Sequence, residues 1–185
     1  MIDIFVASFA LALLSEMADK TQLVILGLGL RYKAPLMVFI GELSAHAVMD
    51  GIAIALGGAF GSFLPFNIIK YVTGAAFIVA GLIMLVRGEK EEHKERIHRN
   101  ALVAAFLTVM LSEFGDKTQI ASGLLAARYL VPLPVLLGTV SALAVAIGVN
   151  VFLGGKVAKQ EWAEEILEKV SPLLFIVFGV IAIVF

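Results

Sequence analysis

The chain has 185 residues, of which 61% are hydrophobic and only 16% are charged, and its formal net charge is −1. A soluble globular domain does not need so much apolar surface, and the near-neutral charge offers no basic patch for nucleic acid. Cysteine is absent, which also excludes disulfides, thiolate metal sites and cysteine nucleophiles.

Six apolar stretches follow one another along the chain, each near the length that a helix needs to cross a bilayer. We place them at about 2–28, 34–58, 66–87, 101–127, 131–154 and 170–185. The predicted fold class is therefore an all-α integral membrane protein with six transmembrane helices. Two polar segments lie between the stretches. Residues 88–100 are expected to form a charged linker, and residues 156–169 an amphipathic segment at the membrane surface.

The distribution of basic residues predicts an orientation in the membrane. Ten of the 14 Lys and Arg residues fall on the connections that share one side of a six-span topology, whereas Lys70 and Arg128 fall on the other side. Because basic loops stay in the cytoplasm, we expect a cytoplasmic linker and both termini outside. A multi-pass protein of the plasma membrane is the expected setting.

The chain contains an internal duplication. The motif SEMADKTQ begins at Ser15 and SEFGDKTQ begins at Ser112, an offset of 97 residues, and six of the eight positions are identical. The same offset relates residues along most of the two halves. Since each half has three spans, the second half enters the membrane from the opposite side. This predicts two inverted-topology three-helix repeats, residues 1–87 and 101–185, with a binding site near the bilayer midplane.

Both motifs place carboxylates in the middle of a predicted span. An intramembrane charge costs about 2.5 to 3.5 kcal/mol on insertion scales, so such residues indicate a functional site. We expect each motif to lie within one continuous helix, where positions i, i+3 and i+4 share a face. Oxygen ligands suit hard or borderline cations such as Mn²⁺, Ca²⁺ and Mg²⁺. The predicted metal ligands are Glu16, Asp19, Glu113 and Asp116.

The charge of the two motifs also favours a cation. Four acids and two lysines sum to −2, which one divalent cation would balance, and protons could replace the metal on crowded, buried carboxylates. Supporting roles are expected for Ser15, Thr21, Gln22, Ser112, Thr118, Gln119, Lys20 and Lys117. The alternative structural interpretation is that each Glu and Lys form an i,i+4 ion pair that fastens the halves together.

A second polar cluster breaks the symmetry of the halves. Glu42, His46 and Asp50 are spaced to share one face of the second span, whereas the residues 97 positions later are Thr139, Leu143 and Ile147. The three titratable groups predict a proton path or an accessory cation site. They are equally consistent with the lining of a water cavity that faces the cytoplasm, or with pairing to a lysine.

The doubled motif resembles the hallmark of the GDT1 family, also called UPF0016, which is Glu-x-Gly-Asp-(Lys/Arg)-(Thr/Ser). Residues 113–118 match it fully, and the first copy matches with Ala18 in the glycine place. The resemblance covers essentially the whole chain. It implies export of Mn²⁺ or Ca²⁺ from the cytosol in exchange for protons, within the lysine-exporter superfamily and without a cofactor. The implied partners are the metal ion, protons and the lipid bilayer.

Other functions are compatible with the residues alone. An exporter of a small organic cation or an amino acid is the main alternative, because buried acids also bind ammonium groups. An enzyme is not expected, since the chain has no HExxH motif and two of its three histidines fall in the linker. A non-transporting scaffold would tolerate neutralisation of Glu16 or Glu113. The sequence leaves the oligomeric state open, a homo-oligomer included.

Overall fold

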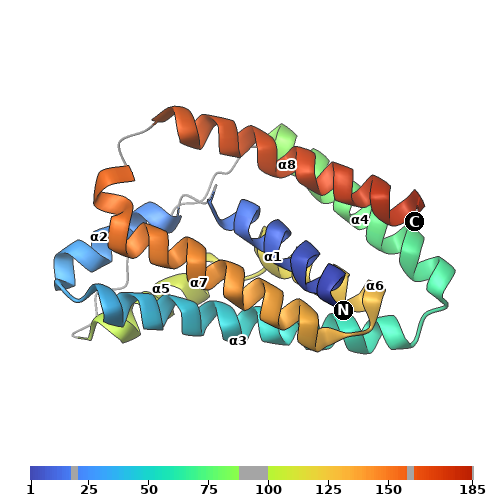
Figure 1. The fold of residues 1–185 in the computed structure, drawn as a ribbon, viewed down its shortest axis with the longest axis horizontal. Helices are drawn as coiled ribbons and strands as arrows, with labels where there is room; N and C mark the ends of the chain where they lie inside the picture. The colour runs from blue at the N-terminus through green and yellow to red at the C-terminus, as the bar shows by residue number, and fades with distance from the viewer. Residues whose placement is uncertain (18–20, 88–99, 158–160, 185) are drawn as a thin grey trace.

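A computed structural model describes residues 1–17, 21–87, 100–157 and 161–184, and within these ranges the chain forms eight helices and no strand (Figure 1). The first half contains α1 (Ile2–Met17), α2 (Thr21–Tyr32), α3 (Pro35–Ser62) and α4 (Phe66–Arg87). The second half contains α5 (Ala101–Ser112), α6 (Lys117–Tyr129), α7 (Pro132–Val157) and α8 (Glu161–Val184). Each half therefore has two short helices followed by two long ones, and the all-α prediction is confirmed for the described residues.

The turn before the third helix of each half has the same backbone signature. Lys33, between α2 and α3, has a φ of 51°, and Leu130, between α6 and α7, has a φ of 55°. They are the two non-glycine residues with positive φ in the described ranges, and their numbers differ by the repeat offset of 97. Pro35 and Pro132 begin the helices that follow, as suits the first turn of a helix. The duplication therefore extends to local backbone geometry.

Helices from opposite halves pack against each other. α1 contacts α7, α5 contacts α3, and α4 lies along α8 (Figure 1). Glycines allow α1 to approach α7 closely and α5 to approach α3 closely. A Cβ atom added at Gly41 on α3 would overlap the carbonyl oxygen of Leu102 on α5, and one at Gly138 on α7 would overlap that of Phe5 on α1. Gly41 and Gly138 are again 97 residues apart, so the two crossings are equivalent.

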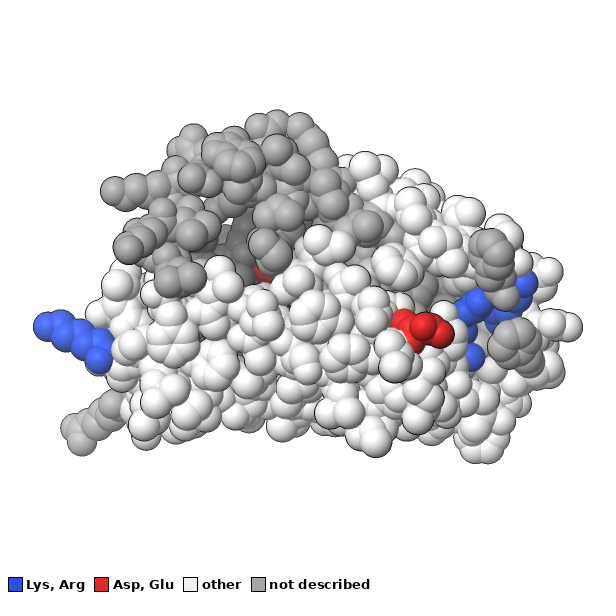
Figure 2. Space-filling view, viewed as in Figure 1, with Lys and Arg blue, Asp and Glu red and all other residues white. Residues whose placement is uncertain are grey.

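The surface of the described residues is largely apolar. Two helical stretches, Pro35–Ser62 of α3 and Pro132–Phe152 of α7, are long and apolar enough to cross a bilayer. Large apolar side chains point outward from the helices, and Phe60 on α3 is 67% exposed. Figure 2 shows a face of mostly uncharged atoms, with Lys and Arg toward the two ends of the long axis. An apolar surface of this extent suits contact with lipid.

The expected fourth span is divided into two helices, and the expected first span contains two helices on either side of residues 18–20, which lie outside the described residues. The stretch expected at 2–28 contains α1 and α2, and the stretch expected at 101–127 contains α5 and α6. The prediction of one continuous helix through each motif is therefore wrong for the second copy, where α5 ends at Ser112 and α6 begins at Lys117. In the first copy, Asp19 and Lys20 lie outside the described residues.

The segment expected to be amphipathic, 156–169, is not separate from the last span. α7 continues to Val157, and α8 begins at Glu161 and runs through Pro172 to Val184. Near Pro172, α8 approaches α4 so closely that a Cβ atom at Gly81 would overlap the Pro172 carbonyl oxygen. A proline inside a membrane helix is tolerated where a neighbouring helix packs against it. Residues 88–99 of the expected linker lie outside the described residues.

Candidate metal site

The second motif lies where the helical hydrogen bonding is interrupted. The Glu113 N–H still donates to the Val109 carbonyl oxygen at 2.8 Å, and Gly115 then adopts a φ of 78°. Asp116 begins the next helix, because its Oδ1 accepts a hydrogen bond of 2.9 Å from the Gln119 N–H. Glycine tolerates this left-handed conformation and aspartate is a favoured N-cap. The motif residues themselves therefore produce the break between α5 and α6.

The side chain of Gln119 makes hydrogen bonds to the backbone of the loop between α5 and α6. Its Oε1 accepts a hydrogen bond of 3.0 Å from the Gly115 N–H, and its Nε2 donates one of 2.6 Å to the Glu113 carbonyl oxygen. The side chain is buried, and both ends of its amide are used in the loop. The supporting role predicted for Gln119 is thus structural: its side chain fixes the backbone between the two acids of the motif.

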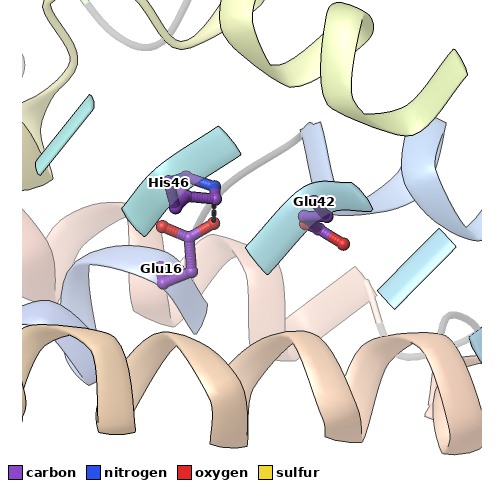
Figure 3. Close-up of side chains that lie close together, drawn as sticks. All are labelled: Glu16, Glu42 and His46. Carbon is purple, nitrogen blue, oxygen red and sulfur yellow. Dashed lines mark ion pairs between the residues drawn. The ribbon is translucent and has the colours of Figure 1, made fainter. Parts of the chain in front are cut away.

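Glu16 of the first motif contacts the second polar cluster. It lies one residue before the end of α1, is 1% exposed, and places its Oε1 3.7 Å from Nε2 of His46 on α3. Glu42 lies one helical turn before His46 on α3. One ligand atom from each of the three side chains lies within 4.8 Å of the other two (Figure 3). Two helices thus bring together two carboxylates and an imidazole, a set able to hold a metal ion.

Asp50 connects this group to the second half. Its Oδ2 is 3.9 Å from Nδ1 of His46, and its Oδ1 accepts a hydrogen bond of 3.0 Å from the Ser122 hydroxyl on α6. Asp50 also interacts electrostatically with Asp116 and with Glu16. Both copies of the motif are therefore within electrostatic range of a single buried carboxylate on α3.

The remaining residues of the second motif occupy different environments. The Glu113 side chain is 2% exposed, and its convergence with Glu16 on one ion stays a prediction. The Ser112 hydroxyl donates to the Thr108 carbonyl oxygen at 2.7 Å and so bonds back to its own helix. The Thr118 hydroxyl is buried and has no hydrogen-bond partner among the described residues. Lys117 is the first residue of α6.

The first motif is described less completely. Ser15 is buried near the end of α1. Thr21 and Gln22 begin α2, but their side chains, like all of Asp19 and Lys20, lie outside the described part of the structure. The expected ligand and supporting roles of these residues stay predictions.

Ser122 lies in the candidate site through its hydrogen bond to Asp50 and was not predicted from the sequence. Its counterpart at the repeat offset is Ile25, so the duplication gave no reason to select it. Its position four residues after Thr118 was an available signal, because residues at i and i+4 share a helix face. A polar residue one turn beyond a buried motif threonine could have been assigned to the same site.

Four carboxyl side chains in this region, Glu16, Glu42, Asp50 and Glu113, are each no more than 2% exposed. Carboxylates buried at this density repel one another and lose hydration, so they require a bound cation or protons. Helices broken at mid-length beside such groups are typical of secondary transporters. The geometry thus favours a cation transporter.

Comparison with known proteins identifies the family. The model of the family described as "Divalent cation/proton antiporter GDT1" matches residues 4–92 and 101–185. The chain therefore belongs to the GDT1 family, as the motifs indicated. This is a family of membrane transporters and not of enzymes.

Three relatives illustrate the similarity. A Vibrio cholerae protein named "Putative manganese exporter" is 34% identical over an alignment that covers 90% of this chain and 83% of the relative. GDT1-like protein sll0615 from Synechocystis is 27% identical, covering 98% and 97%. GDT1-like protein 5 from Oryza sativa subsp. japonica is 28% identical, covering 96% and 93%. No solved structure matches the chain significantly.

Proposed function

We propose that the protein exports a divalent cation from the cytoplasm, Mn²⁺ in preference to Ca²⁺, in exchange for protons. Glu16, Asp19, Glu113 and Asp116 bind the ion near the middle of the membrane. The observation that carries this proposal is the burial of Glu16 and Glu113 at equivalent positions of a duplicated motif. The similarity to a protein named as a manganese exporter favours Mn²⁺ as the ion.

The proposed architecture is six transmembrane spans in two inverted repeats, residues 1–87 and 101–185, joined by a cytoplasmic linker at 88–100. The helix pairs α1 with α2 and α5 with α6 each form one span. Support comes from the repeated order of helices, the matching turns at Lys33 and Leu130, and the equivalent glycine crossings at Gly41 and Gly138. Such repeats place an ion site at the interface between halves.

Proton exchange follows from the charge of the site. The motifs sum to −2 when all their groups are charged, and Glu42 and Asp50 add two further negative charges to give −4. One divalent ion balances only half of that. Since uncompensated charge is costly in a low-dielectric interior, protons balance the remainder and occupy the acids when the metal has left. Competition between metal and protons for the same oxygens is the basis of antiport.

The direction of transport depends on the membrane and the orientation. We propose a plasma-membrane location with both termini outside, because most basic residues fall on the connections of one side. In that orientation an inward proton gradient drives the metal ion out of the cytoplasm.

The test is metal uptake into proteoliposomes with an acidic interior, comparing Mn²⁺, Ca²⁺ and Mg²⁺ at equal concentrations. Proton efflux should drive Mn²⁺ inward, and collapse of the pH gradient with a protonophore should stop the uptake. Glu16→Gln and Glu113→Gln should abolish transport because each removes a buried carboxylate ligand. Asp3→Asn is the matched control, since Asp3 is exposed at the start of α1.

Two outcomes would contradict the proposal. If Glu16→Gln and Glu113→Gln both transport like the parent, the assignment of these residues as metal ligands is wrong. Gradient-driven uptake of lysine or another organic cation, with no metal uptake, would support the alternative of an organic-solute exporter.

A further inference from the structure

The group formed by Glu16, Glu42 and His46 has the composition of a transition-metal site. Its Glu16 oxygen and His46 nitrogen are 3.7 Å apart, and all three ligand atoms lie within 4.8 Å of one another. Ligand atoms about 2.1 Å from a small divalent ion are roughly 3 to 4.2 Å apart, depending on their angle at the metal. Inward movements of less than 1 Å, roughly, would thus bring the three atoms into a coordination sphere.

The His46 ring is oriented as a metal-binding histidine usually is. Nε2 faces Glu16, and Nδ1 faces Asp50 at 3.9 Å on the opposite side of the ring. This separation is longer than a hydrogen bond, but a shift of roughly 1 Å would let Asp50 accept one from Nδ1, and a carboxylate bonded in this way fixes the tautomer of a ligating imidazole and strengthens its donor nitrogen. Asp50 is itself held by the Ser122 hydroxyl at 3.0 Å. A support of this kind favours a metal at Nε2.

The imidazole nitrogen matters because the metal ligands predicted in the duplicated motifs are all oxygen atoms. Oxygen sets suit Ca²⁺ and Mg²⁺ as well as Mn²⁺, whereas imidazole is a ligand for transition metals and adds little for Ca²⁺. At the repeat offset, the positions of Glu42 and His46 hold Thr139 and Leu143. The second half therefore does not repeat this ligand set.

We propose that Glu16, Glu42 and His46 together form a cation subsite in the first half of the protein, in which His46 Nε2 selects Mn²⁺ and similar transition-metal ions over Ca²⁺. This proposal rests on the proposed function and deepens it. It assigns Glu42 and His46 to metal binding rather than to a proton path. Asp50 and Ser122 act as positioning residues behind the imidazole.

The direct test is electron spin echo spectroscopy of Mn²⁺ bound to the purified protein, which detects nitrogen within the coordination sphere. His93 and His98 are first replaced with glutamine, so that His46 is the one histidine left in the chain. We expect a ¹⁴N modulation in this background and its loss on His46→Gln. If the variant that keeps His46 alone binds Mn²⁺ without any nitrogen modulation, the proposal is overturned. This measurement does not require any variant of the site itself to fold.

The functional test is competition between Mn²⁺ and Ca²⁺ in the proteoliposome assay. His46→Gln replaces an imidazole nitrogen with an amide oxygen of similar reach, so the preference for Mn²⁺ should fall by about tenfold while Ca²⁺ transport persists. Glu42→Gln removes a charged oxygen ligand and should weaken the binding of both Mn²⁺ and Ca²⁺.

These results separate this proposal from the proposed function. If the parent moves no divalent cation, the proposed function fails and the subsite has no transported ion to select. If the parent moves Mn²⁺, but His46→Gln keeps the parental preference, the export function stands and the subsite proposal is overturned.

Discussion

Ser122 on α6 donates a 3.0 Å hydrogen bond to Asp50 on α3, and so joins a side chain of the second half to the acidic cluster of the first. Both residues are at most 2% exposed. The bond crosses the contact between α3 and α6, where Gly57 and Gly123 also bring the two backbones close together. The position of the cluster therefore depends on the packing of the halves.

Ser122→Ala should destabilise the protein and weaken metal binding. It removes the hydroxyl donor to a buried carboxylate, which costs about 1 to 3 kcal/mol. Thermal unfolding in detergent should show a lower midpoint, and Mn²⁺ titration a lower affinity. Ser44→Ala is the control, because the Ser44 hydroxyl bonds to the Ile40 carbonyl of its own helix at 2.6 Å. Equal behaviour of the two variants would contradict the role of Ser122.

Gln119→Leu should reduce metal affinity by about tenfold or more, because removal of a side chain that orients the ligands has effects of that size. The substitution keeps the volume but deletes the hydrogen bonds to the Gly115 N–H and the Glu113 carbonyl. Isothermal titration with Mn²⁺ measures the change. Ile120→Leu is the control, since the neighbouring Ile120 is 44% exposed. An affinity like that of the parent would show that the loop is held by other contacts.

Gly115→Ala should cost about 1 to 2 kcal/mol, because an L-residue is disfavoured at a φ of 78°. The loop can relieve this strain only by moving Glu113 or Asp116, so transport should fall as well. Gly29→Ala is the matched control, since a Cβ atom at Gly29 in α2 meets nothing within 4 Å. Thermal unfolding and transport rates should separate the two variants, and a neutral Gly115→Ala would contradict the strain argument.

Gly57→Ala should disrupt the contact between α3 and α6, whereas Gly58→Ala should be tolerated. A Cβ atom at Gly57 would overlap the Gly123 carbonyl oxygen, whereas one at Gly58 has nothing within 4 Å. Membrane helices depend on small residues for such close approach. The yield of monodisperse protein and its thermal midpoint compare these adjacent substitutions directly. Similar losses for both would indicate that helix propensity, and not the crossing, decides the effect.

Much of this arrangement could be predicted from the sequence. The offset between Ser15 and Ser112 identified the duplication that reappears in the order of the helices and in the turns at Lys33 and Leu130. The burial of Glu16 and Glu113 followed from their place within long apolar stretches. These features are local or periodic, and so they can be read from residue spacing.

The helix break and the composition of the site could not be derived in the same way. The apolar stretches on the two sides of the second motif were interpreted as one span, although Gly115 followed by Asp116 was a readable signal of a helix end and a new N-cap. The proximity of Glu16 to His46 depends on how α1 packs beside α3, which no spacing within one helix reveals. Ser122 was missed for the same reason.

The absence of a second copy of the Glu42, His46 and Asp50 cluster has an energetic consequence for the transport cycle. In a perfectly duplicated protein of the proposed inverted-repeat topology, a two-fold axis would relate the inward-open and outward-open states, which would then have equal free energy. Here α3 carries three buried ionisable groups, whereas Leu143 and Ile147 occupy two of the corresponding positions on α7. Exposing one half to water is therefore not equivalent to exposing the other. Under the proposed inverted-repeat topology, the empty carrier would therefore favour one side of the membrane, even before any gradient acts on it.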